Sequence, residues 1–180
     1  MPSGKHSPGP STLVSAAGAT ASSIGAVTGI STVAGGTNGA VTIRADVSAG
    51  TANVLTVNAP IKTTPSSAGT GGAVVLEAAG AITLASAGTI TTDGNGAGAG
   101  GDVFIHQLSG GTNTITLTGA ISAKGGASGN GGAVTVWNEQ GAISLDGKID
   151  VRQGTAGTSD GAIALKASGN ITDTTGASLV

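Results

Sequence analysis

Apolar and polar residues alternate along this chain in short runs, and the runs recur at a nearly constant interval. Five of them open with a Val or Ile that is followed two residues later by a second apolar residue. The openings lie 33, 29, 31 and 29 residues apart, at Val41, Val74, Val103, Val134 and Ile163. A period of two is typical of a β-strand with one buried side. The pattern therefore predicts the same strand about every 30 residues.

Two further short runs follow each opening strand. The second run alternates apolar, Thr or Ser, and apolar in four of the five units, and it begins at Leu55, Ile82, Ile115, Ile143 and Ile171. The third run begins six residues after the second at Ile61, Ile121, Ile149 and Ala177, and eight residues after it at Ile90. A less regular earlier unit is predicted to place Leu13, Ile24 and Ile30 in the three positions.

Three short strands cannot bury their apolar sides alone, whereas stacked units can, because each apolar residue then covers its counterpart one unit away. We therefore predict an all-β fold, a right-handed parallel β-helix (β-solenoid) with about 30 residues and three short strands per rung. The solenoid should span residues 12–180 in about six rungs, after a flexible leader or cloning remnant at 1–11. Inward side chains are expected at Val74, Leu76, Val103, Ile105, Val134 and Val136, and outward ones at Val75, Phe104 and Thr135.

Composition narrows the possible functions. The 180 residues include 34 Gly, one Phe, one Trp, no Tyr and no Cys, so disulfides and thiol catalysis are excluded. The net charge of −2 gives no basic surface for nucleic acid, and no apolar run is long enough to span a bilayer. The glycine-rich segments before each opening strand lack the Gly-Lys-Ser/Thr of a nucleotide-binding loop and the regular Asp of a calcium-binding repeat. No cofactor is expected.

Two segments carry a resemblance to a known family. They read GDVFIHQLSGGTNTITLTGAISAKGG at 101–126 and GGAVTVWNEQGAISLDGKIDVRQG at 131–154. Each has a glycine lead, a strand and then Ile-x-Leu-x-Gly-x-Ile, and this resembles the repeat region of filamentous haemagglutinin-type exoproteins of two-partner secretion and related autotransporters. The resemblance covers roughly residues 12–180. It implies an internal segment of a secreted or surface-displayed bacterial stalk that acts in adhesion, biofilm formation or cell contact.

One outward position holds the candidate binding residues. Three residues after each opening lie Arg44, Glu77, His106, Trp137 and Lys166, which should form one outward column when the units stack. The column is a candidate contact strip for host or cell-surface glycans, with Trp137 as a stacking platform for a sugar ring. The alternative interpretation is a solvated face of mixed charge, on which Glu77 lies near Arg44 and His106.

Other functions receive less support from the pattern. A glycoside hydrolase needs two carboxylates about 5–9 Å apart, and the acidic residues are scattered, with Glu139 and Asp146 flanking a turn and a strand of one unit. No catalytic activity is therefore expected, although a polysaccharide-binding or polysaccharide-cleaving β-helix is an alternative. Ice binding is another, because the second strand has a hydroxyl file at Thr56, Thr83, Thr116, Ser144 and Thr172. A two-file threonine grid would need Thr two residues later, where the chain has Asn58, Ala85, Thr118, Asp146 and Thr174.

The ends of the repeat predict the partners. No polar cap follows the last unit, so an open strand edge and an open apolar column are expected there. We expect end-to-end β stacking on adjoining repeats of a longer exoprotein or, alternatively, on copies of the chain. Head-to-tail stacking is heterologous and would make the chain a self-assembling extracellular fibre subunit.

Overall fold

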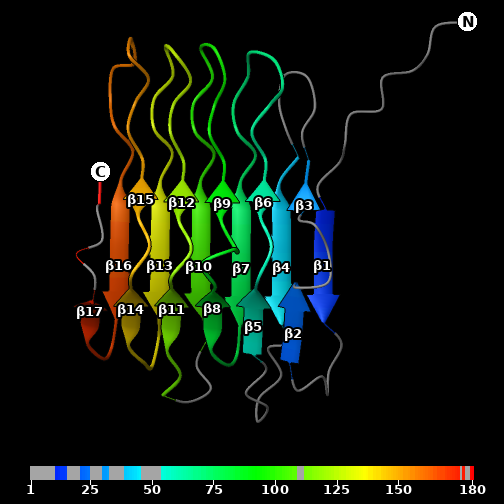
Figure 1. Cartoon of the computed structure of the whole chain (residues 1–180), viewed down its shortest axis with the longest axis vertical. Helices are drawn as coiled ribbons and strands as arrows, with labels where there is room; N and C mark the ends of the chain where they lie inside the picture. The colour runs from blue at the N-terminus through cyan, green and yellow to red at the C-terminus, as the bar shows by residue number, and fades with distance from the viewer. Residues whose placement is uncertain are drawn as a thin grey trace, which may run out of the picture.

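A computed structural model describes residues 11–15, 21–24, 30–32, 39–45, 54–108, 112–174, 176 and 179–180, the first two of these segments as backbone alone. Within these residues the chain is all β, without a helix, and its strands form three parallel sheets. Figure 1 shows the sheets as three rows of strands that progress together from the N-terminal to the C-terminal end. The all-β, parallel β-solenoid prediction is confirmed, and its handedness stays a prediction.

Each sheet takes one strand from every rung. Sheet A contains, in spatial order, β1 (Ser11–Ser15), β4 (Val41–Ala45), β7 (Val74–Ala78), β10 (Val103–Gln107), β13 (Val134–Asn138) and β16 (Ile163–Ala167). Sheet B contains β2 (Ala21–Ile24), β5 (Val54–Val57), β8 (Ile82–Leu84), β11 (Ile115–Leu117), β14 (Ile143–Leu145) and β17 (Ile171–Asp173). Sheet C contains β3 (Ile30–Ser31), β6 (Ile61–Lys62), β9 (Ile90–Thr91), β12 (Ile121–Ser122) and β15 (Ile149–Asp150).

The register between rungs follows the apolar openings. The five predicted sheet A openings pair in one continuous line, Val41, Val74, Val103, Val134 and Ile163. The sheet B openings from Leu55 to Ile171 pair in the same way. Because strands of successive rungs pair in parallel without a slip, every apolar residue covers the equivalent residue of the next rung.

A single apolar core runs through the described rungs. The six side chains predicted to point inward are all buried, from Val74 in β7 to Val136 in β13. The residues predicted to point outward between them, Val75, Phe104 and Thr135, are half-buried. Ile, Leu and Val supply the sheet B and sheet C faces of the core, and roughly 1.5–3 kcal/mol for each fully buried side chain makes this column the main source of stability.

Three expected positions shift by two residues in the structure. In the first rung Ser11 pairs with Val41 and Leu13 with Ile43, so Leu13 takes the register position of Ile43, and Ser11 belongs to β1 and not to the leader. Ile24 likewise pairs with Val57 and not with Leu55. In the last rung Leu179 bridges to Ile149, whereas the expected Ala177 lies outside the described residues. A shift of two keeps the same side of the strand inward, which is why the pattern could not distinguish these positions.

The glycine-rich segments form a thin projection that we call the glycine fin, residues 64–71, 93–100, 124–131 and 152–160. Figure 1 shows these segments as a row of narrow loops beyond the ends of the sheet C strands. Each loop has an outgoing and a returning wall, and both walls bond to the next rung: Gly94 N donates to Lys124 O at 2.8 Å, and Gly100 N to Asn130 O at 2.9 Å. A Cβ on Gly94 would lie 2.0 Å from Gly98 O on the opposite wall. The fin is therefore two backbones thick, with no room for side chains between its walls.

Buried threonines join the two walls at the base of the fin. Thr63 Oγ1 donates to Gly72 O at 2.6 Å, and Thr92 Oγ1 donates to Gly101 O at 2.7 Å. The backbone closes the same junction, because Gly101 N donates to Thr92 O at 2.7 Å. These hydroxyl groups are polar members of the core that are hydrogen-bonded, as burial requires.

Candidate functional site

The charged column, Arg44, Glu77, His106, Trp137 and Lys166, is aligned as predicted. The sheet A register pairs each member with the next, from Arg44 in β4 to Lys166 in β16. Glu77 forms an ion pair with Arg44 through Oε2, and its Oε1 lies 3.8 Å from His106 Nδ1. The predicted neighbourhood of Glu77, with Arg44 on one side and His106 on the other, is therefore confirmed.

His106 differs from the prediction in its burial. It occupies an outward position of β10, yet it is only 7% exposed. Its Nε2 lies 2.8 Å from Glu139 Oε1, and the Trp137 ring stacks on it with centroids 4.5 Å apart and planes 15° apart. Phe104 packs beside it as well, at a centroid distance of 5.2 Å. The imidazole is covered because its neighbours in the sheet are large rings and because Glu139 reaches back from the following turn.

Trp137 is the exposed aromatic residue of the column, at 40% relative exposure. One face of its ring lies against His106, and the Lys166 Nζ lies 6.0 Å from its centroid. A sugar ring would need a free indole face. Lys166 is a flexible side chain that must move before a sugar can stack there, so in this geometry the indole edge is the surface open to a ligand. Ligand contact at the charged column stays a prediction.

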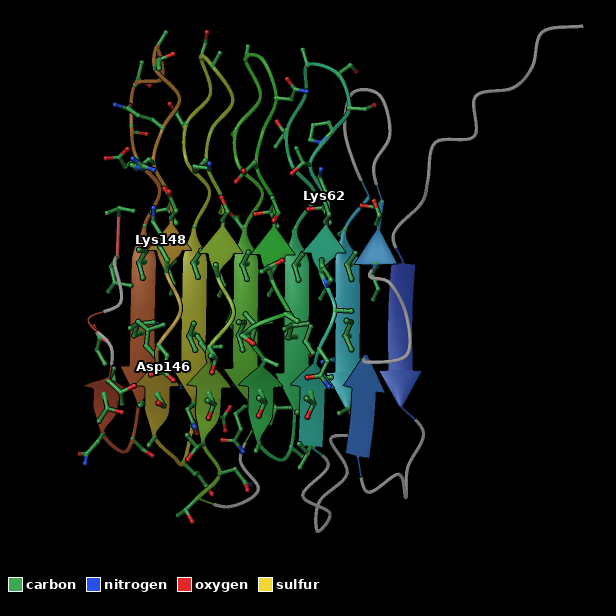
Figure 2. All side chains as sticks on the ribbon, in the orientation of Figure 1. Lys62, Asp146 and Lys148 are labelled. Atoms are coloured by element: carbon green, nitrogen blue, oxygen red, sulfur yellow. The ribbon has the colours of Figure 1, made fainter. Side chains whose placement is uncertain are left out.

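A second polar cluster lies outside sheet C, around Asp150. Asp150 is 6% exposed, and its carboxylate accepts hydrogen bonds from Arg152 Nε at 2.9 Å and Arg152 Nη2 at 2.7 Å. Lys148 Nζ lies 3.1 Å from Asp150 Oδ2. The Arg152 guanidinium, followed by Lys148, holds the pKa of Asp150 well below its ordinary value, although burial acts in the opposite direction. Figure 2 labels Lys148 at this end of the sheet C row and Lys62 toward the other end.

The Asp150 cluster was missed in the sequence analysis, although a signal for it was present. Residues 148–152 read Lys-Ile-Asp-Val-Arg, so the three charged residues alternate with two inward apolar ones. A similar contact occurs one rung earlier, where Ser122 Oγ donates to Asp93 Oδ1 at 2.6 Å and Lys124 Nζ lies 3.7 Å from Asp93 Oδ2. Asp93 and Asp150 are thus both paired with basic side chains of the protein.

Asp150 should make the stability of the solenoid depend on pH. Because its folded-state pKa is depressed, its contribution to the free energy of unfolding is complete above the ordinary carboxyl range, about pH 4. The contribution is lost as the pH falls from there toward the folded-state pKa. Urea unfolding of the chain and of Asp150→Asn between pH 7 and pH 2 should give a stability difference that shrinks on acidification. A difference of the same size at both ends of the range would contradict this role for Asp150.

Sheet B carries the hydroxyl file in register on its outer side. Thr56, Thr83, Thr116 and Ser144 are half-buried and pair in sequence, and Thr172 continues the file. The second file is mixed, as the sequence shows, and in it Thr174 Oγ1 donates to Asp146 Oδ1. Figure 2 labels Asp146 at the end of β14. Sheet B thus differs from sheets A and C in that its described strands carry no Lys, Arg, His or aromatic side chain.

Among the described residues, no group of three or more His, Cys, Asp or Glu side chains is arranged to hold a metal ion. No helix in the described part of the chain is both long and apolar enough for a membrane span. Comparisons of the chain with family models, with curated proteins and with solved structures found no match.

Proposed function

We propose that this chain is a structural repeat segment of a secreted or surface-displayed bacterial exoprotein, whose stalk acts in adhesion or cell contact. The observation that carries the proposal is the slip-free stacking of the strands in all three sheets. Such stacking suits a rigid rod, because each rung bonds only to its two neighbours and length is gained by adding rungs. The resemblance of residues 101–126 and 131–154 to haemagglutinin-type repeats supports the same proposal.

Charge pairing on the outer faces also favours a structural role. Glu77, Glu139 and Asp150 each bind a basic or imidazole partner within the protein. A catalytic carboxylate has to be positioned against a substrate, and these groups are positioned against their neighbouring rungs. We propose no catalytic role. The exposed edge of Trp137 together with Lys166 is where we propose contact with cell-surface glycans.

Surface localisation tests the proposal directly. Antibodies raised against the purified chain should label intact cells that express the parent gene, and added protease should remove the label. Deleting the coding segment should lower attachment of those cells to surfaces or to one another. An antigen that becomes detectable only after cell lysis would contradict surface display, and unchanged attachment of the deletion strain would contradict the adhesive role.

A further rung, supplied by a longer chain or by a second copy in a fibre, would cover apolar surface at the last described rung. The last described rung exposes large apolar side chains, with Ile171 at 47%, Leu179 at 46% and Val180 at 40%. In the rungs before it, the side chains equivalent to Ile171 are fully buried, as Ile143 and Ile115 show. Stacking of a further rung on β16 and β17 would bury these side chains and pair the free strand edge.

Head-to-tail association should therefore appear at high concentration of the isolated 180-residue chain. Light scattering should show a mass that grows with concentration, because heterologous contacts produce open filaments. Replacing the exposed Ile171 with lysine should reduce this growth by placing a charge in the contact, whereas replacing Lys62 with glutamate on the side of the rod should not. A mass that stays monomeric over the whole concentration range would exclude the fibre alternative.

A further inference from the structure

Sheet B presents a straight row of hydroxyl-bearing positions that we call the hydroxyl row. Every one of its six strands contributes a Ser or Thr at the same register position, Ser23, Thr56, Thr83, Thr116, Ser144 and Thr172. Neighbouring strands of a sheet lie about 4.8 Å apart, so the row has this repeat. Threonine is restricted at χ1, and the backbone beneath is hydrogen-bonded to both neighbouring rungs, so the spacing is rigid.

The protein itself makes little use of these hydroxyl groups. Thr172 Oγ1 lies 3.4 Å from Ile143 O, which is a long contact. Within the described part of the chain, the members from Thr56 to Ser144 make no side-chain hydrogen bond. A hydroxyl group can donate one hydrogen bond and accept two. Four consecutive rungs therefore offer the same unused donor and acceptors to water at a constant interval.

The strands that carry the row have short side chains and little charge on this face. The described strands of sheet B contain no Lys, Arg, His or aromatic residue. Sheet A, by contrast, carries the charged column with its stacked rings, and the sheet C side carries Lys62, Lys124, Lys148 and Arg152. Two residues after each member from Thr56 onward, near the ends of the strands, lie Asn58, Ala85, Thr118, Asp146 and Thr174, of which Asp146 is the charged one. Long hydrated side chains thus project from two faces of the solenoid and not from the third.

We propose that the outer face of sheet B binds ice through the hydroxyl row, a function separate from the structural role proposed above. An ice surface is neutral and periodic, and it offers hydrogen-bond donors and acceptors to a matching array. The row presents hydroxyl groups and threonine methyl groups in fixed positions, so little side-chain entropy is lost when it meets ordered water. The second file, with Ala85 and Asp146 among its members, leaves the single hydroxyl row as the contacting element.

Ice-affinity partitioning of the intact chain tests the proposal. Ice grown slowly from a dilute solution should take up the chain well above the level of an inert protein of similar size, and crystals grown in its presence should be faceted. Thr116→Tyr should abolish this uptake, because one large ring in the middle of the row lifts its neighbours off the ice surface. Thr135→Tyr is the matched control on sheet A, where the same substitution on a half-buried threonine should leave uptake unchanged.

Thermal unfolding of both variants separates binding from folding. Should Thr116→Tyr fail to fold, Thr116→Val removes the hydroxyl group, keeps the size and the strand propensity, and should still lower uptake. Exclusion of the unmodified chain from ice would overturn the proposal. An equal loss of ice uptake in Thr135→Tyr and Thr116→Tyr would overturn it as well. Binding to crystalline cellulose or chitin that depends on Thr116, without uptake into ice, would assign the row to a polysaccharide instead. None of these outcomes bears on surface display or attachment of the cells.

Discussion

Ile143→Asp should lower the free energy of unfolding by at least about 4 kcal/mol. Ile143 is 0% exposed and stacks in the inward column of sheet B, between Ile115 and Ile171. Losing a fully buried isoleucine costs roughly 1.5–3 kcal/mol. The new carboxylate would also face an apolar column without a basic partner, so its desolvation adds to the loss. Urea unfolding at pH 7, followed by circular dichroism of the β-sheet signal, measures the difference.

Ser144→Asp is the matched control for this prediction. Ser144 is the next residue of β14 and points to the outer, half-buried side. Ser144→Asp places the same carboxylate in the same strand and rung, but in contact with water. The loss in free energy of unfolding should therefore be a small fraction of the loss for Ile143→Asp. Equal losses for the two variants would mean that the inward and outward sides of sheet B are wrongly assigned.

The strand register could be predicted from the sequence because two independent patterns agree. A period of two assigns a side to each residue, and the 29 to 33 residue interval aligns the openings at Val74, Val103 and Val134. Where only one pattern is present, the prediction loses accuracy. In the first rung Leu13 keeps step with the alternation but pairs with Ile43 and not, as expected, with Val41, because the apolar interval there is irregular. The alternation is a more robust signal than the 30-residue interval, because a shift of one residue would expose the whole apolar side of a strand.

The burial of His106 could not be predicted from the same patterns. The alternation of apolar and polar residues predicts an outward position for His106, and the structure agrees with that position in β10. Its burial depends on the Trp137 ring of the next rung and on Glu139, which returns from a turn whose path the alternation does not define. The bidentate contact between Asp150 and Arg152, by contrast, joins two residues that are two positions apart in the chain. Because alternate residues of a strand share a side, the alternation alone predicts that these two side chains lie together.

The glycine fin shows what a pattern of apolar positions leaves undefined. The glycine-rich segments contain few apolar residues, so the alternation assigns them no register. Their backbones nevertheless stack rung on rung: Gly71 N donates to Ala99 O, Gly100 N to Asn130 O and Gly131 N to Ser159 O. The recurring signal was the glycine itself at equivalent positions, as in Gly101, Gly132 and Gly161. Close backbone approach is a reason for glycine that hydrophobic patterning does not record.

Gly129→Ala should destabilise the chain by about 3 kcal/mol or more, although it adds a single methyl group. A Cβ on Gly129 would lie 1.8 Å from Gly98 O and 2.5 Å from Gly98 C, both backbone atoms of the preceding rung. No side-chain rotation can relieve this overlap, so the two rungs of the fin must move apart. The movement would break the bonds between the two rungs from Gly126 N to Gly98 O and from Ser128 N to Gly96 O, both 2.9 Å long.

Gly169→Ala provides the graded comparison, because a Cβ there would approach no atom closer than 3.1 Å, at Gly141 C and O. Shifts of a few tenths of an ångström relieve such a contact, so this variant should stay near the parent in urea unfolding. Hydrogen exchange locates the effect: in Gly129→Ala the amides of residues 93–100 and 124–131 should lose protection before those of the sheet A strands. If Gly129→Ala unfolds at the same urea concentration as the parent, the successive loops of the fin are not in backbone contact. In that case the glycines serve as flexible connections, and the solenoid depends on its apolar core alone.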